Sequence, residues 1–308
     1  MRALVPTGRP EEMVVLAEAE LPEPAPDEAL VEVRAFSINR GEVFQLHGPL
    51  ERIGRPGKDV AGVVVRAAAD GSGPAVGQRV VGHPPARGWA EFVAVPTSSL
   101  AVLPDGVSFE QAAALPLAGL TALRLLRLCG PLAGRRLLLT GASGGVGHYV
   151  VELALGAAAD VTAVTATAER GKRLAELGAE VVHEVSDAVG PYDAVLESVG
   201  GTSTPQALAL LAPRGQLVWF GQASRTPAQL SFFEFFKGPR SGVIRHFHYE
   251  HSDEPFRPDL EELVELVAED RLHPHIGRLA DWRETAAALN DLRDRKIVGN
   301  AVLTVSGG

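Results

Sequence analysis

The stretch LLLTGASGGVGHYV, residues 137–150, decides the fold expected for this chain of 308 residues. Three leucines typical of a buried strand precede glycines 141, 144 and 147, and a helical pattern follows. In a dinucleotide-binding βαβ unit, such glycines allow a tight turn, close approach of a pyrophosphate and close packing of helix on strand. Because the N–H groups of a helix N-terminus bind phosphate, the stretch predicts a dinucleotide site. It is not a P-loop, since no Gly-Lys-Ser/Thr follows.

The segments around this stretch alternate between short apolar strands and helical patterns such as HYVVELALGAA (148–158). Strands are expected at RRLLLTG (135–141), DVTAVTA (160–166), DAVLESVG (193–200) and GQLVWFG (215–221). Strands that alternate with helices form a parallel sheet covered on both faces. We therefore expect an α/β fold whose Rossmann domain, a doubly wound parallel sheet, covers residues 115–255.

The first 114 residues have a different sequence pattern, in which glycine and proline separate short runs of β-forming residues. These runs are ALVEVRAFSI (29–38), DVAGVVVRA (59–67), GQRVVG (77–82) and AEFVAVP (90–96). Regular short strands with turn signals indicate a compact β-rich domain. Near the C-terminus the sequence predicts helices over 258–270 and 282–294 and a final strand, NAVLTV (300–305).

Composition excludes several classes of function. The formal net charge is -9, which disfavours binding to nucleic acid or to an anionic membrane. Cys129 is the only cysteine in the sequence, so the chain can form neither an internal disulfide nor a cage of thiolates around a metal. The N-terminus has no long apolar segment, and we expect a cytoplasmic protein without a membrane partner.

The choice between NADH and NADPH depends on the end of the strand that starts at Asp160. An enzyme that prefers NADH places an acid there on the ribose hydroxyls, but Thr165 to Thr167 include none. Arg170, Lys172 and Arg173 follow at once and suit a 2′-phosphate, which predicts NADPH. The alternative is an ordinary solvated helix face with glutamates as partners.

Several motifs taken together resemble the medium-chain dehydrogenase/reductase superfamily, in its zinc-independent quinone oxidoreductase (zeta-crystallin-like) branch. They are SINRGEVF (37–44), PGKDVAGVV (56–64), VGQRVVG (76–82), GWAEFVAVP (88–96), LPLAGLTAL (115–123), TGASGGVG (140–147), ESVGG (197–201) and KIVGNAVL (296–303). The resemblance covers nearly the whole chain. It implies a GroES-like catalytic domain of residues 1–114, completed by the C-terminal segment 256–308, with a Rossmann domain of residues 115–255 inserted between them.

The resemblance also locates the positions that bind the catalytic zinc in the zinc-dependent branch. Here they are Asn39, Lys58 and Leu117, none of which suits zinc, so we expect no metal. Two groups of histidines remain as candidate chelators, His246, His248 and His251 in one and His273 and His275 in the other. The first group is interpreted as polar residues on the face of an edge strand and not as metal ligands. The second group is likewise not expected to bind a metal.

Without a Lewis acid, reduction of an electron-poor substrate is favoured over oxidation of an alcohol. Asn39 would donate a hydrogen bond to the developing oxyanion, and Lys58 would supply charge or a proton. Thr121 resembles a family residue that lies against the nicotinamide. The alternatives are a turn residue for Asn39, a lysine paired with Asp59 or with solvent for Lys58, and a core threonine for Thr121.

The residues expected to bind the cofactor are Gly141, Ser143, Gly144, Gly145, Val146, Gly147, Thr165, Arg170, Val199 and Gly221. The chain departs from the branch at Phe44, where a tyrosine is frequent, and at Gly299-Asn300, where Gly-Lys is usual. These changes leave the proton donor and the substrate open. The aromatic run SFFEFFK (231–237) is interpreted either as a wall of the cleft or as plain core.

The sequence thus predicts an NADPH-dependent reductase of quinones or activated alkenes. The resemblance implies a homodimer, and VIRHFHY (243–249) is the strand expected at its interface. Two alternatives stay open at this point. One is a tailoring enoyl reductase of secondary metabolism that acts on a bulky enone, and the other is a non-catalytic NADPH-binding protein.

Overall fold

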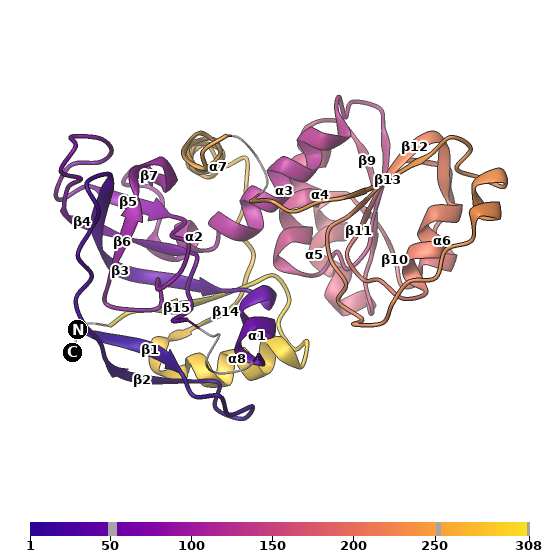
Figure 1. The fold of residues 1–308 in the computed structure, drawn as a ribbon. Helices are drawn as coiled ribbons and strands as arrows, with labels where there is room; N and C mark the ends of the chain where they lie inside the picture. The colour runs from indigo at the N-terminus through magenta and orange to yellow at the C-terminus, as the bar shows by residue number, and fades with distance from the viewer. Residues whose placement is uncertain (49–53, 251–253, 307–308) are drawn as a thin grey trace. The chain divides into compact units, whose positions relative to one another are not determined.

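The computed structural model of the chain describes residues 1–48, 54–250 and 254–306. It divides into two compact units, Met1–Leu120 with Asp253–Gly308, and Thr121–Ser252. Figure 1 shows their elements with the labels used below. Each unit is described by itself.

The first unit consists mainly of short antiparallel strands. In chain order its strands are β1 (Arg2–Pro6), β2 (Val14–Glu18), β3 (Glu28–Ile38), β4 (Val60–Arg66), β5 (Arg79–Gly82), β6 (Phe92–Pro96), β7 (Leu100–Val102), β14 (Ile276–Asp281) and β15 (Asn300–Thr304). Its helices are α1 (Arg40–Leu46), α2 (Phe109–Ala113), the start of α3 (Pro116–Cys129), α7 (Arg257–Ala268) and α8 (Thr285–Arg293), with 3₁₀ turns η2 (Thr97–Ser99) and η5 (Trp282–Glu284).

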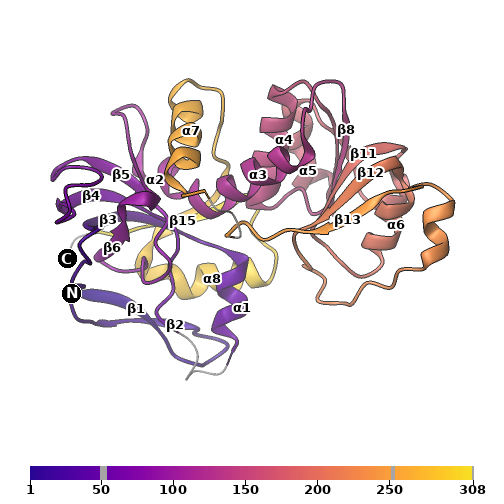
Figure 2. The same ribbon diagram turned by 45° about the horizontal axis from the view of Figure 1, so that its top comes forward.

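A seven-stranded sheet with the order β14-β15-β3-β4-β5-β7 forms the body of this unit, and β6 also pairs with β3. The long strand β3 is buried along most of its length because it has partners along both edges. The C-terminal strand β15 pairs with β3, so the C-terminal segment completes this unit, as Figure 2 shows. Valine, leucine and two buried tryptophans, Trp89 and Trp282, fill the core.

The second unit is built of alternating strands and helices. Its strands are β8 (Arg136–Leu139), β9 (Asp160–Val164), β10 (Glu180–Val182), β11 (Tyr192–Glu197), β12 (Leu211–Trp219) and β13 (Val243–His246). Its helices are the rest of α3, α4 (Gly145–Gly156), α5 (Ala168–Leu177) and α6 (Ser203–Ala209), with 3₁₀ turns η3 (Val185–Asp187) and η4 (Phe232–Phe236).

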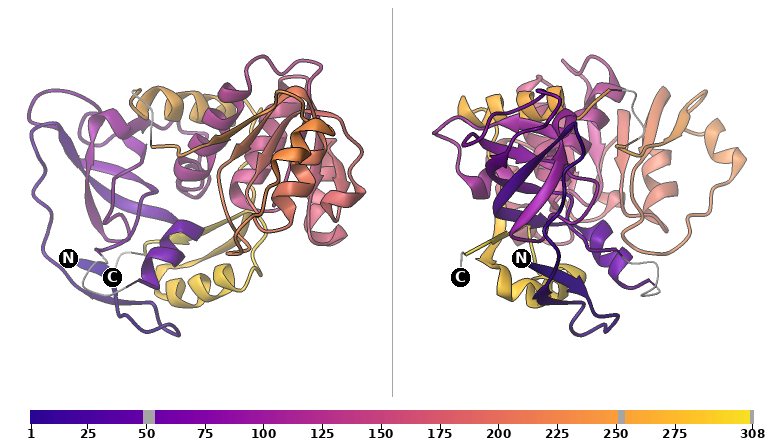
Figure 3. Two further views of the ribbon diagram at one scale, coloured as in Figure 1. Left: turned by 45° about the vertical axis from the view of Figure 1, so that its right-hand side comes forward. Right: turned by 60° about the vertical axis from the view of Figure 1, so that its left-hand side comes forward.

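The six strands form one parallel sheet with the order β10-β9-β8-β11-β12-β13. Helix α4 packs on β9, α5 packs on β9 and β10, and α6 packs on β11 and β12 (Figure 3). This is the doubly wound arrangement, and the strand order reverses between β8 and β11. Ligands of such sheets bind at the carboxyl ends of the strands at this reversal.

The expected fold class is confirmed, with one correction in local structure. Helix α2 ends before α3 because Pro116, which lacks an N–H, begins α3. Phe232, Phe233 and Phe236 are 71%, 72% and 62% exposed, so plain core is wrong for these three side chains. Phe235 of the same run does pack against the core cluster of this unit.

The sequence patterns missed the hairpin of β1 and β2 and the short strand β10. They placed β13 correctly, although it ends at His246. No helix in the described part of the chain is long and apolar enough to cross a bilayer.

Candidate active site

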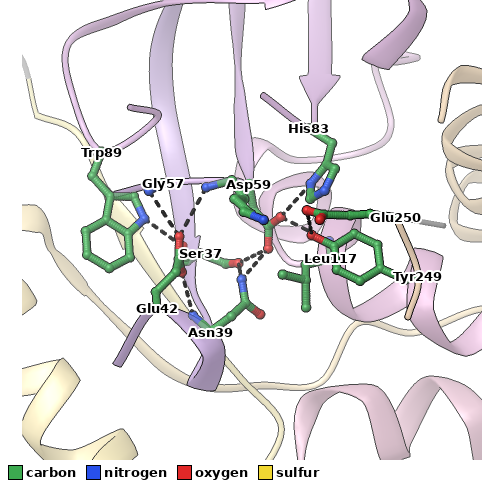
Figure 4. A network of polar contacts seen from close by, with 11 residues as sticks. Ser37, Asn39, Glu42, Gly57, Asp59, His83, Trp89, Leu117, Tyr249 and Glu250 are labelled. Carbon is green, nitrogen blue, oxygen red and sulfur yellow. Dashed lines mark hydrogen bonds and ion pairs between the residues drawn. The ribbon is translucent and has the colours of Figure 1, made fainter. Parts of the chain in front are cut away.

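A carboxylate at the centre of the first unit, that of Asp59, has four hydrogen-bond partners from three segments of the chain (Figure 4). Its Oδ2 accepts from the hydroxyl of Ser37 (2.6 Å) and the side-chain amide of Asn39 (2.7 Å). Its Oδ1 accepts from the backbone N–H of Leu117 (3.0 Å) and lies 3.1 Å from Nδ1 of His83. Asp59 has no exposed surface, so these donors replace water as its solvation. The residue fixes the start of α1 and the start of α3 at one point.

A second buried carboxylate, that of Glu42, holds the neighbouring backbone. Its Oε1 accepts from the N–H groups of Gly57 (3.0 Å) and Lys58 (3.2 Å), and its Oε2 accepts from that of Asn39 (2.9 Å). Burial and, secondarily, the negative charge of Asp59 raise the pKa of Glu42 to about 8. The three N–H donors favour the ionised form but do not outweigh burial. Near neutral pH, Glu42 is therefore largely protonated, and a single negative charge remains on the pair.

The raised pKa of Glu42 makes the stability of the first unit depend on pH. The folded protein retains a proton that the unfolded chain releases above pH 4.5, so stability falls as the pH rises towards 8. The expected slope from this group is about 1.4 kcal/mol per pH unit at most. Urea titrations between pH 5 and pH 8 should show a flatter dependence for Glu42→Gln than for wild type. The exposed control Glu12→Gln should keep the wild-type slope; equal slopes in all three proteins would contradict this assignment.

The structure changes the role expected for the side chain of Asn39. Its Nδ2 donates to Asp59 and lies 3.4 Å from the hydroxyl of Ser37, so its donors are used inside the network. The carboxylate of Asp59 requires donors and thereby fixes the orientation of the amide. Asn39 thus offers a carbonyl oxygen as its remaining polar atom, which is an acceptor and not the donor predicted above. It also precedes α1 as the N-cap, so the turn-residue alternative describes its backbone.

Two of the three positions that match zinc ligands meet on Asp59. Asn39 contributes its side chain and Leu117 its backbone N–H, while Lys58 directly precedes the carboxylate in the chain. Among residues 1–48, 54–250 and 254–306, no group of three His, Cys, Asp or Glu side chains could hold a metal.

The histidines considered as chelators lie apart from this network in the chain. His246 ends β13, Nδ1 of His248 lies 4.0 Å from a carboxylate oxygen of Glu250, and His251 falls outside the described residues. Nε2 of His273 lies 3.0 Å from Oδ1 of Asp270, and His275 accepts through its backbone carbonyl from the N–H of Asn300 (2.8 Å).

The glycine loop of the second unit lies at the sheet reversal. Gly141 has φ +64°, a conformation that glycine adopts without strain. A Cβ on Gly147 would be 2.1 Å from the carbonyl oxygen of Ala142, so close packing of α4 requires glycine there. A Cβ on Gly144 would have only an ordinary contact, 3.6 Å from the oxygen of Gly141. Its surroundings are open, as approach of a phosphate requires.

The N-terminus of α4 supplies donors for such a phosphate. The helix begins at Gly145, so the N–H groups of Gly145, Val146 and Gly147 have no acceptor within the helix. The helix is 12 residues long, and its dipole favours an anion at this end. This arrangement fits a pyrophosphate.

Arg170 lies beside the same loop. Its Nε donates to the hydroxyl of Ser143 (3.1 Å), which joins the start of α5 to the glycine loop. Thr165 is buried at the end of β9, and its hydroxyl donates to the carbonyl of Thr167 (3.1 Å). No acid lies in this link between β9 and α5, whereas Arg173 faces Glu176 at 3.9 Å. Of the basic cluster, Arg170 is thus the member that the structure ties to the loop.

The other expected cofactor residues, Val199 and Gly221, follow β11 and β12 at the same edge of the sheet. Glu197 is fully buried and holds this edge, because it accepts from the N–H groups of Val199 (2.8 Å) and Gly200 (2.7 Å) and from Ser203 (3.0 Å). All ten residues expected to bind the cofactor therefore belong to the second unit and follow the carboxyl ends of neighbouring strands.

Three further side chains bear on the chemistry. Thr121 is buried on α3 in the second unit, and its role stays a prediction. Phe44 is 38% exposed, with the guanidinium of Arg40 5.9 Å from its ring centre. Burial raises the pKa of Cys129 to about 11, so its thiol remains protonated at neutral pH.

Sequence reasoning missed Glu42, His83 and Glu197 and treated Asp59 only as a partner for Lys58. One signal was available, because an N-cap Asn39 followed three residues later by Glu42 is the spacing of a capping box. His83 and Leu117 are 24 and 58 positions from Asp59 in the chain, and only the folding of the first unit brings them to the carboxylate.

The chain matches two family models. Residues 25–105 match the alcohol dehydrogenase GroES-like domain, and residues 176–303 match the zinc-binding dehydrogenase domain. The spectinabilin polyketide synthase system protein NorB of Streptomyces orinoci is 34% identical over 297 residues, which are 91% of this chain but 13% of NorB. The quinone oxidoreductase-like protein 2 of Bos taurus is 28% identical over 94% of this chain and 89% of its own length.

Among solved structures, mycobacterial Rv1454c complexed with NADPH has a TM-score of 0.86 and 26% identity, with 99% of this chain and 100% of that chain covered. The first match lies within the first unit, and the second covers part of the second unit and the C-terminal segment that completes the first. The chain belongs to the medium-chain dehydrogenase/reductase superfamily, in its quinone-oxidoreductase-like branch.

Proposed function

We propose that the chain is an NADPH-dependent reductase that transfers hydride to a quinone or to an activated alkene without zinc. The observation that carries this proposal is the network on Asp59. Of the three positions that match zinc ligands, Asn39 and Leu117 donate to this carboxylate and Lys58 directly precedes it in the chain. An oxygen, an ammonium and an apolar side chain do not form a zinc site. The glycine loop with Arg170 supports NADPH as the cofactor, and a relative in this fold carries it.

When bound, NADPH would supply the hydride, and the chain's own residues would bind and orient the reactants. The N-terminus of α4 would hold the pyrophosphate, and Arg170 the 2′-phosphate. Asn39, fixed by Asp59, would accept a hydrogen bond from an amide or hydroxyl group. Lys58 would place a positive charge near the oxygen on which negative charge develops. Because Phe44 cannot donate a proton, the proton that the product needs would come from Lys58 or from solvent.

The experiment that tests this proposal follows NADPH oxidation by the purified protein across small quinones, small enones and extended enones. We expect turnover of at least one class, no stoichiometric zinc by elemental analysis, and no loss of activity with a chelator. About one zinc per chain bound at tetrahedral-site affinity would contradict the metal-free mechanism. Tight NADPH binding without turnover of any electrophile would favour a non-catalytic role.

A second candidate, an enone reductase of secondary metabolism, is favoured by one observation. The chain matches a segment of a polyketide synthase system protein at 34% identity. If this candidate is right, extended enones should be turned over more efficiently than quinones in the same panel.

A homodimer through the sheet edge belongs to the same proposal. Among the described residues β13 pairs with β12 alone, so its other edge is available to a second chain. The exposed Phe232, Phe233 and Phe236 lie in the same unit.

Arg170→Ala tests the choice of cofactor. A charge-assisted hydrogen bond to phosphate contributes roughly 1.5 to 3 kcal/mol, so NADPH affinity should fall by about 10- to 100-fold. NADH affinity should hardly change, because NADH has no phosphate at that place. The measurement is a pair of cofactor titrations, with Arg173→Ala as the matched control. Equal weakening of both cofactors would mean that Arg170 only supports the loop through Ser143.

A further inference from the structure

Two arginines of the first unit lie on paired backbone segments close to the Asp59 network. The N–H of Arg87 donates to the carbonyl of Arg55 (3.1 Å), and the N–H of Gly88 donates to that of Gly57 (2.9 Å). The approach is so close that a Cβ on Gly57 would lie 2.3 Å from the backbone nitrogen of Trp89. The same segment continues to Lys58 and Asp59. The two guanidinium groups are thus carried on one rigid corner of the catalytic unit.

Neither arginine is neutralised by the part of the chain that the structure describes. No ion pair or side-chain hydrogen bond joins Arg55 or Arg87 to any described residue, whereas Arg2, Arg9 and Arg66 each face a glutamate. This is unexpected in a chain with 38 acidic and 29 basic residues. The Nη1 atom of Arg55 is buried without an acceptor within the described residues. A buried cationic N–H of this kind is costly unless another group accepts from it.

The two arginines also act on each other. Burial and, secondarily, the positive charge of Arg87 lower the pKa of Arg55, so the charges are near enough to repel. Arg87 has φ +70°, the left-handed region that is strained for a residue with a side chain. The buried N–H of Arg55, the repulsion between the two guanidinium groups and the backbone strain at Arg87 all oppose folding. An anion bound between the guanidinium groups would accept from the buried N–H and would reduce the repulsion.

We propose that Arg55 and Arg87 form a subsite for an oxyanion, a carboxylate or a phosphoryl group carried by the substrate. The proposal rests on the reductase function above and names its substrate class. Guanidinium groups match both oxyanions because their N–H donors form parallel, bidentate hydrogen bonds. Since Arg55 is three residues from Lys58, the anion would anchor the end of the substrate next to the reacting group.

The test compares three substrates of nearly equal size in the presence of NADPH. They are 4-(3-oxobut-1-enyl)benzoate, its neutral methyl ester and the corresponding aryl phosphate. Wild type should use at least one anion with a kcat/KM about 10- to 100-fold above that of the ester, the effect of one charge-assisted contact. The preferred anion identifies the source of the oxyanion. Equal kcat/KM for all three would overturn the subsite and leave the reductase intact.

Variants then assign the preference to the two arginines. Arg55→Ala and Arg87→Ala should each lose most of the preference through KM, with the ester and NADPH affinity unchanged, and Arg55→Lys should retain part of it. Arg9→Ala, which removes one exposed charge far along the chain, should keep the full preference. Because Arg87 is exposed, its variant remains informative if Arg55→Ala fails to fold. If Arg87→Ala and Arg55→Lys both keep the full wild-type preference for the anion over the ester, the assignment to these two arginines is overturned.

A protein that turns over none of these compounds would refute the proposed function, and the subsite is then judged by binding alone. Calorimetric titration of the benzoate into the NADPH-loaded protein should show binding to wild type that is weakened in both alanine variants. Binding of equal strength to all three proteins, or to none of them, would overturn the subsite.

Discussion

Gly147→Ala is expected to destabilise the second unit and to abolish measurable NADPH binding. The added methyl would lie 2.1 Å from the carbonyl oxygen of Ala142, and backbone cannot move aside as a flexible side chain can. Overpacking of this kind costs about 1–3 kcal/mol or more. The forced movement displaces the loop and the first N–H groups of α4 together. Thermal unfolding and NADPH fluorescence titration measure the two effects.

Gly144→Ala separates cofactor binding from stability. Its φ of -82° suits alanine, and its Cβ would be 3.6 Å from the oxygen of Gly141, an ordinary contact. The unfolding temperature should therefore stay close to that of wild type. The methyl would nevertheless occupy the space through which a pyrophosphate approaches the backbone, and NADPH affinity should fall by about 100-fold, or about 3 kcal/mol. A stable Gly144→Ala protein that binds NADPH like wild type would contradict the placement of the pyrophosphate.

These two variants also show why the second unit was readable from the sequence. The glycines of 141–147 act through local geometry, and the alternation of strand and helix fixes a parallel sheet. The sequence therefore located β8, β9, β11 and β12 and the loop between β8 and α4. It missed β10, which is only three residues long and carries too little pattern.

The network in the first unit was less accessible, because its energetics depend on contacts between distant residues. Asp59 and Leu117 are 58 positions apart, and His83 and Asp59 are 24 apart. A sequence pattern has no period that joins such positions. The resemblance located Asn39, Lys58 and Leu117, but it gave neither the carboxylate that holds them nor the direction of the Asn39 amide.

Asp59→Ala is expected to destabilise the first unit by about 3–5 kcal/mol, the usual cost of removing one partner from a buried charged network. Four groups lose their acceptor, those of Ser37, Asn39, His83 and Leu117. Loss of the charge beside Glu42 offsets only part of this cost. Urea unfolding of wild type and variant measures the difference. A change below about 0.5 kcal/mol, typical of surface sites, would show that the carboxylate does not hold the network.

Asp59→Asn is the more informative variant, because it keeps the shape and removes the charge. Its amide accepts on one side only, so the side chain of Asn39 must turn its carbonyl inward and present its N–H groups outward. We expect a smaller loss of stability, about 1–3 kcal/mol, and a loss of turnover on the order of 10-fold. NADPH affinity should not change, since every residue expected to bind the cofactor belongs to the other unit.

The pH dependence of this variant distinguishes the network from a purely structural role. The charge of Asp59 is the second cause of the raised pKa of Glu42, so in Asp59→Asn that pKa should fall below about 8 while burial keeps it above its ordinary value. Wild type loses stability with rising pH over the whole range up to that pKa, whereas the variant stops losing it earlier. The stability difference between the two proteins should therefore be largest near pH 5 and smallest near pH 8. A difference that is constant with pH would mean that Asp59 and Glu42 do not interact through their charges.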